Sequence, residues 1–537
     1  MSPRRASVAL LAVGATVLTP LAVPAGPAAA ERTVPDSARV EARWAAARCG
    51  GASTTPVLDS RRTTVTLPPA RPYVVGSIPW SRWQRPDSSD PTWQMRFYSL
   101  EWMKPIAKRA HDDGQRQVLR RLVSQVESFY RANPDKGRST LGWDEGTSLR
   151  RLGTLSCVSV LTGDPRLEKR MAGEVGLLFG PRYYGPPRHP VHNHGLMANM
   201  NIKVAGEVVG RRDWVRAADQ RMRRESALAF TKAGTSHEQS AWYHLVNTTM
   251  WRAVGERMKD ANPKDATARE ILARTAKADV VGRWLTEPDG DLVQIGDTAR
   301  GPGMAPRGTE RPGVFRDDQA GLLVGRWSWK DPSTTYYTVR YGPPRFAHGH
   351  PDKGAVTWST AGARVLVGPG YYSYEWKDPF ASYARTAQAH NVARPVRGKE
   401  NVRAAATLRH ERARNGVHAW NVDDRVHGVA HRRGVRVDDK ARTLTVTDGY
   451  PRGVALQQSW HLDPSWSLVG RTGNTLTFRD RAGRTLRMTT TGRVVSADRG
   501  RTRPVAGWNY PATGRRVPAW EVTTGGTGTV RTTFTIR

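Results

Sequence analysis

Three histidines and an aspartate occur close together in the second half of the sequence. His348, His350 and Asp352 stand at alternate positions, and His390 follows in an Ala-His-Asn segment. Because side chains alternate across a β-strand, a His-x-His pair on a strand places both imidazoles on the same face. Such a pair can bind a metal ion or transfer protons, but it can equally be a pair of polar surface residues. The pattern alone leaves both interpretations open.

A second polar group precedes an apolar helical pattern in the first half of the chain. Asn193 and His194 come directly before Gly195 and a helix predicted at residues 196–209. One interpretation is an ordinary helix start with Asn193 as the cap. The other is a set of neutral donors at the positive end of a helix, where they could hold a carboxylate.

Tyr243 lies in a further polar segment, which runs from Ser236 to His244 and includes Glu238. A tyrosine on an amphipathic helix usually packs in the core or at its boundary. The polar residues on both sides of Tyr243 favour a position in a site instead.

The first thirty residues have the organisation of a secretory signal. Arg4 and Arg5 precede an apolar run at residues 8–18, and three alanines at residues 28–30 provide a small-residue cleavage site. This pattern predicts export and removal of residues 1–30. No later apolar run reaches the ~18 residues that a membrane-spanning helix needs, so we expect a secreted protein without a membrane anchor.

The composition indicates an anionic partner. The formal net charge of the 537 residues is +35, and a field of that sign attracts polyanions. The arginines are spread along the whole chain, and no zinc-finger, RNP or basic-zipper pattern occurs. We therefore expect an acidic polysaccharide rather than nucleic acid as the partner of this exported protein.

Cys49 and Cys157 are the two cysteines of the sequence. In an oxidising compartment they could form one disulfide that joins the N-terminal segment to a later helix. Two unpaired buried thiols are the alternative. Two cysteines are too few for a cysteine zinc site.

Hydrophobic periodicity divides the chain into a helical part and a β part. Helical spacing recurs between residues 95 and 290, whereas alternating apolar residues and turn signals dominate after residue 315. We predict an N-terminal segment and helical domain at residues 31–300, a Gly/Pro/Arg-rich linker at 301–314, and an antiparallel β-sandwich at 315–537. Periodicity does not distinguish an open helical bundle from a curved toroid.

Several motifs resemble those of the heparinase II/III-type polysaccharide lyases and occur in the same order. They span residues 90–400 and are Trp143-Asp144-Glu145-Gly146, Asn193-His194-Gly195, Glu238-Gln239-Ser240 before Tyr243-His244, Ile295-Gly296-Asp297, His348-x-His350-x-Asp352, Pro369-Gly370-Tyr371-Tyr372-Ser373-Tyr374 and Ala389-His390-Asn391. Each motif is weak alone, and their joint order is what carries the resemblance.

The resemblance implies an α/α toroid followed by an antiparallel β-sandwich, and β-elimination of uronate-containing glycans. Removing the C5 proton of a uronate requires neutralisation of its carboxylate, a role implied for Asn193 and His194 with help from His348. Tyr243 is implied as the base, the acid or both, although a phenol with an ordinary pKa near ~10 needs cationic neighbours. His348 is the competing base.

The resemblance also suggests substrate-binding residues and a shared site. Tyr383 would be a second phenol, and Arg385 could bind a carboxylate or sulfate through two hydrogen bonds. Because Tyr243 belongs to the helical part and His348 to the β part, we expect neither part to be active alone.

The expected metal chemistry is structural rather than catalytic. Relatives carry a zinc held by residues that correspond to His350, Gly368 and His390 of this sequence. Gly368 has no side-chain ligand, and two histidines make a poor zinc site unless Asp352 or water completes it. No metal is expected to be required for catalysis.

Two other functions remain open from the sequence. A glycan-binding protein could retain the lyase fold without its activity, as the glycine at position 368 suggests. A hydrolase with paired carboxylates would use Glu145, Glu238 or Asp297, but the histidine, asparagine and tyrosine set suits elimination better.

Overall fold

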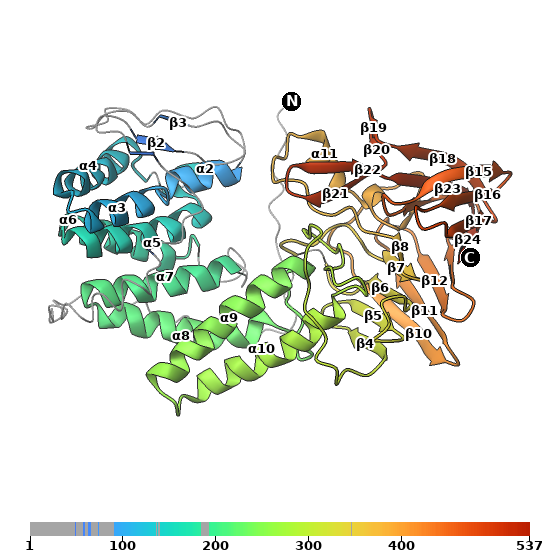
Figure 1. Ribbon diagram of the computed structural model, residues 1–537, viewed down its shortest axis with the longest axis horizontal. Coiled ribbons are helices and arrows are strands. Elements are labelled where there is room, and N and C mark those ends of the chain that lie inside the picture. The colour runs from blue at the N-terminus through green and yellow to red at the C-terminus, as the bar shows by residue number, and fades with distance from the viewer. Residues whose placement is uncertain are drawn as a thin grey trace. The chain divides into compact units, whose positions relative to one another are not determined.

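The computed structural model in Figure 1 describes residues 49, 57–58, 63–65, 73–74, 91–135, 137, 140–183, 193–344 and 346–537. The predicted signal peptide lies outside the described residues. The chain divides into two compact units, Met1–Ala227 and Leu228–Arg537. The boundaries predicted from the sequence, at residues 300 and 315, remain predictions.

The first unit is mainly helical. A small antiparallel sheet accompanies its helices. The elements are β1 (Val57–Leu58), β2 (Thr63–Val65), β3 (Tyr73–Val74), α2 (Pro91–Tyr98), α3 (Met103–Asp112), α4 (Arg116–Ala132), η1 (Leu141–Trp143), α5 (Glu145–Thr162), α6 (Arg166–Phe179), α7 (Asn193–Val209) and α8 (Arg212–Ala229).

Helix α5 is the centre of the first unit, and it is buried along most of its length. It contacts α3, α4, α6 and α7, and its leucines at 149, 152 and 155 are completely buried. Its buried polar side chains find partners within the unit, as Arg151 does in Glu174 at 2.7 Å. Its Asp144 cap accepts a hydrogen bond from the Gly146 amide.

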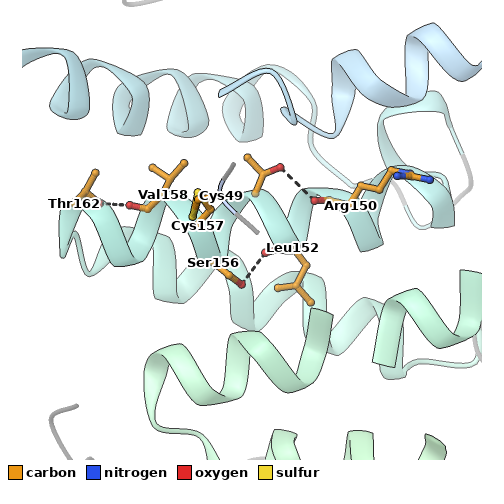
Figure 2. The surroundings of a disulfide bond; sticks show 8 residues. Cys49, Arg150, Leu152, Ser156, Cys157, Val158 and Thr162 are labelled. Atoms are coloured by element: carbon orange, nitrogen blue, oxygen red, sulfur yellow. Dashed lines mark hydrogen bonds between the residues drawn. A yellow bond between two sulfur atoms is a disulfide. The ribbon is translucent and has the colours of Figure 1, made fainter. Parts of the chain in front are cut away.

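Cys49 and Cys157 form a disulfide, which settles the two alternatives left open by the sequence. Figure 2 shows the bond on α5, with Cα atoms 5.4 Å apart and 108 positions between them in the sequence. A cross-link over so long a loop restricts the unfolded chain and so stabilises the folded one. It attaches the N-terminal segment to the central helix of this unit.

The second unit begins with two helices and continues as antiparallel sheets. Its helical elements are α9 (Ala241–Ala261), α10 (Ala266–Trp284), α11 (Pro379–Ala384) and η2 (Ala387–Ala389). Its strands are β4 (Gly313–Asp317), β5 (Leu322–Arg326), β6 (Tyr336–Arg340), β7 (Val356–Thr360), β8 (Ala363–Leu366), β9 (Ala393–Pro395), β10 (Ala406–Arg414), β11 (Val417–Asp424), β12 (His431–Asp438), β13 (Thr443–Gly449), β14 (Ala455–His461), β15 (Ser467–Thr472), β16 (Thr475–Arg479), β17 (Thr485–Thr490), β18 (Arg493–Arg499), β19 (Arg501–Thr502), β20 (Val505–Ala506), β21 (Trp508–Ala512), β22 (Arg515–Pro518), β23 (Trp520–Thr527) and β24 (Thr529–Ile536).

Three larger sheets build this unit. They have the strand orders β4-β5-β6-β7-β8, β10-β11-β12-β13-β24-β17-β16-β15 and β18-β23-β14-β9. Alternating side chains such as Leu444 and Val446 of β13 point into a common core with Trp460 and Phe534. The predicted order, helices first and antiparallel sheets second, is confirmed. Of the helices that the structure describes, none is long and apolar enough to cross a membrane.

A buried charge cluster joins three strands of the large sheet, β11, β12 and β13. His431 of β12 lies between two carboxylates, with Nδ1 2.7 Å from Asp424 and Nε2 2.8 Å from Asp448. Asp448 also accepts two hydrogen bonds from Arg433. Burial alone would lower the pKa of His431, but hydrogen bonds and charge from the two aspartates outweigh it and raise that pKa to about 9.

We expect this cluster to make folding stability pH-dependent above neutrality. A pKa raised above the ordinary 6.5 gives stabilisation that is complete below pH ~6.5 and lost as the pH rises through about 9. The expected loss is on the order of 3 kcal/mol. Urea unfolding between pH 6 and 10 should show this fall in the free energy of unfolding. The fall should be absent in His431→Gln and present in His111→Gln, which changes an exposed histidine. If the free energy of unfolding of His431→Gln fell with pH as steeply as that of the wild type, the assignment would be contradicted.

Candidate active site

The first turn of α9 is tied to the loop that carries Asp297. The Ser240 hydroxyl accepts a hydrogen bond from the backbone N–H of Tyr243 and caps the helix. It also donates to the backbone carbonyl of Asp297 over 3.1 Å and lies 3.0 Å from the Thr298 hydroxyl. One cap residue therefore fixes Tyr243 next to Asp297.

Gly296 allows three chain segments to meet at this point. Its φ is +58°, and an added Cβ would collide with the carbonyl oxygens of Gln239 and His348. The amide of Asp297 donates to the same His348 carbonyl over 2.9 Å. A side chain at position 296 would push these segments apart. Steric crowding therefore explains why the Ile295-Gly296-Asp297 motif has a glycine at this position.

The carboxylate of Asp297 accepts hydrogen bonds from four side chains. Its Oδ1 lies 2.9 Å from His350 Nε2 and 2.7 Å from Arg385 Nη2. Its Oδ2 lies 3.0 Å from His348 Nδ1 and 3.1 Å from the Tyr374 hydroxyl. Burial raises the pKa of Asp297, but hydrogen bonds from the two histidines and the charge of Arg385 outweigh burial and hold that pKa well below its usual range. Asp297 is therefore an ionised acceptor.

His348 is held at both ring nitrogens. Because Asp297 is ionised, Nδ1 of His348 donates to it, whereas Nε2 lies 3.4 Å from Glu238 Oε2. Glu238 is buried and accepts a hydrogen bond from Asn247 over 2.8 Å. Two carboxylates on opposite edges therefore fix the orientation of the ring.

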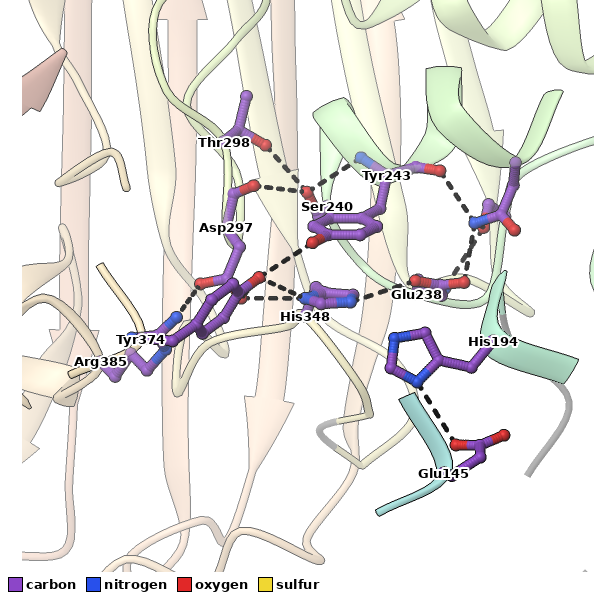
Figure 3. Close-up of polar contacts among 12 residues, drawn as sticks. Glu145, His194, Glu238, Ser240, Tyr243, Asp297, Thr298, His348, Tyr374 and Arg385 are labelled. Carbon is purple, nitrogen blue, oxygen red and sulfur yellow. Dashed lines mark hydrogen bonds and ion pairs between the residues drawn. The ribbon is translucent and has the colours of Figure 1, made fainter. Parts of the chain in front are cut away.

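Tyr243 lies against the face of this imidazole. The two ring centroids are 3.3 Å apart and the planes are inclined by 5°. The Tyr243 hydroxyl lies 3.0 Å from that of Tyr374, which donates in turn to Asp297. Figure 3 shows the Tyr243 and His348 rings close together, with Tyr374 and Asp297 beside them. We call this group of four residues the Tyr243 cluster.

Tyr374 remains a phenol within the Tyr243 cluster. Burial and the negative charge of Asp297 raise its pKa well above the ordinary value. Its single hydroxyl hydrogen can go either to Asp297 or to the oxygen of Tyr243. The structure thus adds Tyr374 and Asp297 to the predicted residues Tyr243 and His348.

Of the two predicted substrate-binding residues, only Arg385 contacts the Tyr243 cluster. Its Nη1 donates to the Ser373 carbonyl over 2.9 Å, and its guanidinium lies 4.9 Å from the Tyr374 ring centroid. Tyr383 instead donates to Glu521 over 2.5 Å. The second phenol beside Tyr243 is therefore Tyr374, and a substrate-binding role for Tyr383 remains a prediction.

Asn193 and His194 belong to the first unit, at the N-terminus of α7. Asn193 is buried, and His194 Nδ1 lies 3.3 Å from Glu145 Oε2, a contact also drawn in Figure 3. Residues 184–192 lie outside the described part of the chain. The carboxylate-neutralising role of Asn193 and His194 remains a prediction.

His350 and His390, the predicted metal ligands, meet at 3.1 Å between His350 Nδ1 and His390 Nε2. The other ring nitrogens also have hydrogen-bond partners. His350 Nε2 lies 2.9 Å from Asp297, and His390 Nδ1 lies 2.8 Å from the Thr386 carbonyl. Burial and the neighbouring His350 lower the pKa of His390 to about 3, so His390 is neutral and can accept a hydrogen bond from His350. Hydrogen bonds thus account for all four ring nitrogens.

The donor set does not fit a zinc site made by protein ligands. The backbone at Gly368 is packed against the Gln294 carbonyl, so no side chain can enter there. Asp352 is buried nearby and interacts electrostatically with both histidines. Among the described residues, however, no group of three His, Cys, Asp or Glu side chains is arranged to hold a metal ion. Two imidazoles alone do not complete a zinc tetrahedron.

We expect the protein to keep its stability without zinc. Metal analysis of purified protein should give well under one zinc per chain, and dialysis against a strong chelator should leave the midpoint of thermal unfolding unchanged. The reason is that His350 and His390 are held by hydrogen bonds to Asp297 and Thr386. One zinc per chain, together with a lower midpoint after chelation, would contradict this expectation.

Comparison with known proteins agrees with this architecture. Residues 316–534 match the family described as heparinase II/III-like, C-terminal. No curated protein sequence matches the chain significantly. A crystal structure of heparinase III is similar with a TM-score of 0.68 at 16% identity, over 84% of this chain and 78% of that one.

Two further solved structures share the fold. A heparan sulfate lyase from Pedobacter heparinus has a TM-score of 0.57 at 16% identity, over 84% of this chain and 77% of that one. A chondroitin AC lyase from Streptomyces coelicolor A3, in complex with chondroitin sulphate, has a TM-score of 0.51 at 9% identity, over 94% and 80% of the two chains. The predicted resemblance is therefore confirmed: residues 316–534 form a heparinase II/III-like C-terminal domain, in a chain with the α/α toroid and β-sandwich fold of the heparinase II/III-type polysaccharide lyases.

Proposed function

We propose that this chain is a secreted polysaccharide lyase that cleaves an acidic, uronate-containing glycan by β-elimination. The observation that carries the proposal is the Tyr243 cluster, in which a phenol stacks on His348 and is joined through Tyr374 to the ionised Asp297. The fold and the net charge of +35 support a polyanionic substrate.

The proposed reaction breaks two bonds and forms one double bond. A base removes the C5 proton of the uronate, and the electrons of that C–H bond form the C4=C5 double bond. The C4–O4 glycosidic bond breaks, and an acid gives a proton to the departing oxygen. The products are a 4,5-unsaturated uronate at a new non-reducing end and a glycan with a free hydroxyl.

Tyr243 is the residue we assign to the proton transfers. In its phenolate form it could accept the hydroxyl hydrogen of Tyr374, 3.0 Å away, and it lies against the His348 ring, which is held between Asp297 and Glu238. The same oxygen, once protonated by C5, can return the proton to the leaving O4. Asp297 is not the acid, because its low pKa keeps it ionised, and the same low pKa makes it too weak a base for the C5 proton.

Asn193 and His194 are our candidates for neutralising the uronate carboxylate. An amide and an imidazole at a helix N-terminus are donors suited to a developing enolate. His194 also lies beside Glu145, which can orient its ring. The similar lyases are named for heparin, heparan sulfate and chondroitin substrates, so glycosaminoglycans are the first polymers to try.

The site is poorly suited to hydrolysis by a carboxylate pair. A hydrolase needs one carboxylic acid with a raised pKa, but Asp297 has a lowered pKa and four donors of its own. Glu238 is buried and faces His348. Asp297 is therefore not a proton donor to a glycosidic oxygen, and the Glu238 carboxyl group is directed at the His348 ring.

The mature protein should generate ultraviolet absorbance of a conjugated double bond from at least one acidic polymer. The panel is heparan sulfate, chondroitin sulfate, hyaluronan, alginate and polyglucuronate. Tyr243→Phe should lower the rate by about 10²-fold or more, because general acid and base catalysis contributes that much. Tyr372→Phe is the matched control, since that tyrosine packs on Phe380 and Tyr510 away from the cluster.

New reducing ends without this absorbance would contradict elimination in favour of hydrolysis. Binding of a polymer without any cleavage would favour the alternative of a non-catalytic glycan-binding protein. A fully active Tyr243→Phe variant would remove Tyr243 from the mechanism.

Asn193→Ala and His194→Ala should each lower kcat by about 10²-fold, the typical cost of losing one preorganised donor to a developing anion. Unfolding transitions of both variants should first be compared with the wild type. If both variants retain full kcat on the polymer that the wild type cleaves, the carboxylate is neutralised by other residues.

A further inference from the structure

A cavity of about 620 Å³ lies in the second unit, next to α11 and η2. It is formed by this helical segment, by β9 and the loop that follows it, and by the turn before β20. Its polar lining residues are Ser382, Tyr383, Thr386, Gln388, Arg394, Glu400 and His427, and its apolar ones are Pro379, Ala387, Pro395, Val396, Gly398, Pro504 and Val505. In Figure 1, α11 lies beside the strand pairs β19–β20 and β21–β22.

The polar wall of this cavity is fixed from behind by a buried carboxylate. Glu521 is 1% exposed and accepts hydrogen bonds from Tyr383 over 2.5 Å and from the Gln388 amide over 3.1 Å. This orientation of the amide leaves Gln388 Oε1 as an acceptor for Arg394 Nη2, 3.2 Å away. Arg394 is therefore held at the end of a chain of hydrogen bonds, which is how preorganised binding sites are built.

Arg394 has no acidic partner among the residues that the structure describes. Its one hydrogen bond goes to the neutral side chain of Gln388, and its Nε is buried without a hydrogen-bond acceptor. A guanidinium presents its donors in a planar fork that matches a carboxylate or sulfate. The acidic lining residue Glu400 lies near the buried Lys353. Burial lowers the pKa of Lys353, and the charge of Glu400 partly opposes that lowering. His427 has its pKa lowered by burial and is a neutral donor or acceptor at pH 7.

The remaining lining suits a sugar ring. Prolines and valines offer apolar surface for the C–H face of a pyranose, whereas hydroxyl, amide and imidazole groups can bond its hydroxyls. A volume of about 620 Å³ is in the range of small-molecule sites and exceeds that of one monosaccharide.

We propose that this cavity is a second glycan-binding site, which takes an acidic sugar residue with its carboxylate or sulfate on Arg394. The site is separate from the Tyr243 cluster, and only the choice of a sugar over another organic anion rests on the proposed function. Both sites share one short segment. Tyr383 and Gln388 line the cavity, whereas Arg385 between them bonds to Asp297.

Methyl β-D-glucuronide is the probe, because it is a single acidic sugar with no glycosidic substituent at O4 and so cannot be cleaved by elimination. Its dissociation constant would be measured by NMR titration with wild type, Arg394→Gln, Arg397→Gln and Tyr243→Phe, with methyl β-D-glucoside as the neutral comparison. Val396→Trp, at a lining residue that is 53% exposed, would fill the cavity with little effect on the core.

We expect Arg394→Gln to weaken glucuronide binding by about tenfold or more, because a charge-assisted hydrogen bond is lost. Val396→Trp should abolish it, and the neutral glucoside should bind about tenfold more weakly than the glucuronide. Arg397→Gln, an exposed arginine nearby, should bind within about twofold of wild type, and so should Tyr243→Phe.

Several results would overturn the proposal. The first is wild type that does not bind the glucuronide. The second is binding that Val396→Trp and Arg394→Gln leave intact. The third is binding that Tyr243→Phe abolishes, since it would then belong to the Tyr243 cluster. Inorganic sulfate that displaces the glucuronide at equal concentration would show a simple anion site instead. The probe is not a lyase substrate, so the titration tests the cavity independently of the elimination assay. A failed elimination assay would contradict the proposed function without deciding whether the cavity binds the glucuronide.

Discussion

The buried carboxylate of Asp297 is the interaction on which the site depends. It accepts hydrogen bonds from His348, His350, Tyr374 and Arg385. A buried charge is costly unless it is paired and fully bonded, and here the positive charge of Arg385 and the histidine donors meet that requirement. In return, the ionised carboxylate fixes the orientation of each donor. Tyr243 is not bonded to Asp297 itself, but it lies on His348 and reaches Tyr374, so its position follows from the same carboxylate.

The segment that contains α11 and η2 carries side chains with different tasks. Arg385 bonds to Asp297, whereas Tyr383 and Gln388 bond to Glu521 and line the cavity. His390 follows and meets His350. A short helix with the Asp378 cap and a following 3₁₀ turn can expose successive residues to different neighbours. Two buried acidic residues, Asp297 and Glu521, thus accept hydrogen bonds from different side chains of one segment.

Much of the architecture could be predicted from the sequence, because it depends on local periodicity. Helical spacing gave α4, α5 and α10, and alternation gave β13 and β24. The motifs also identified Tyr243 and His348, which the structure brings into contact. The predicted order of helices and sheets is confirmed, whereas the catalytic roles of Tyr243 and His348 remain predictions.

The rest depended on contacts between segments far apart in the chain. Tyr374 and Asp297 were both part of recognised motifs, but nothing in their own segments showed that a hydroxyl and a carboxylate 77 positions apart would bond. Tyr383, nine residues after Tyr374 in the sequence, looked equally suited to be the second phenol, and only the position of Glu521 separates the two. The pairing of Cys49 with Cys157 was likewise open until the structure placed their Cα atoms 5.4 Å apart.

The ionisation of Asp297 can be measured directly by carbon NMR of protein labelled with ¹³C at the aspartate carboxyl groups, with Asp297→Asn to assign the signal. The carboxylate bonded to two histidines, Arg385 and Tyr374 should show no titration step near the ordinary pKa of 3.8 and should stay ionised to the lowest pH at which the fold persists. A titration step at or above that ordinary value would contradict the account, because a protonated Asp297 could not hold His348 and Tyr374 as the structure shows.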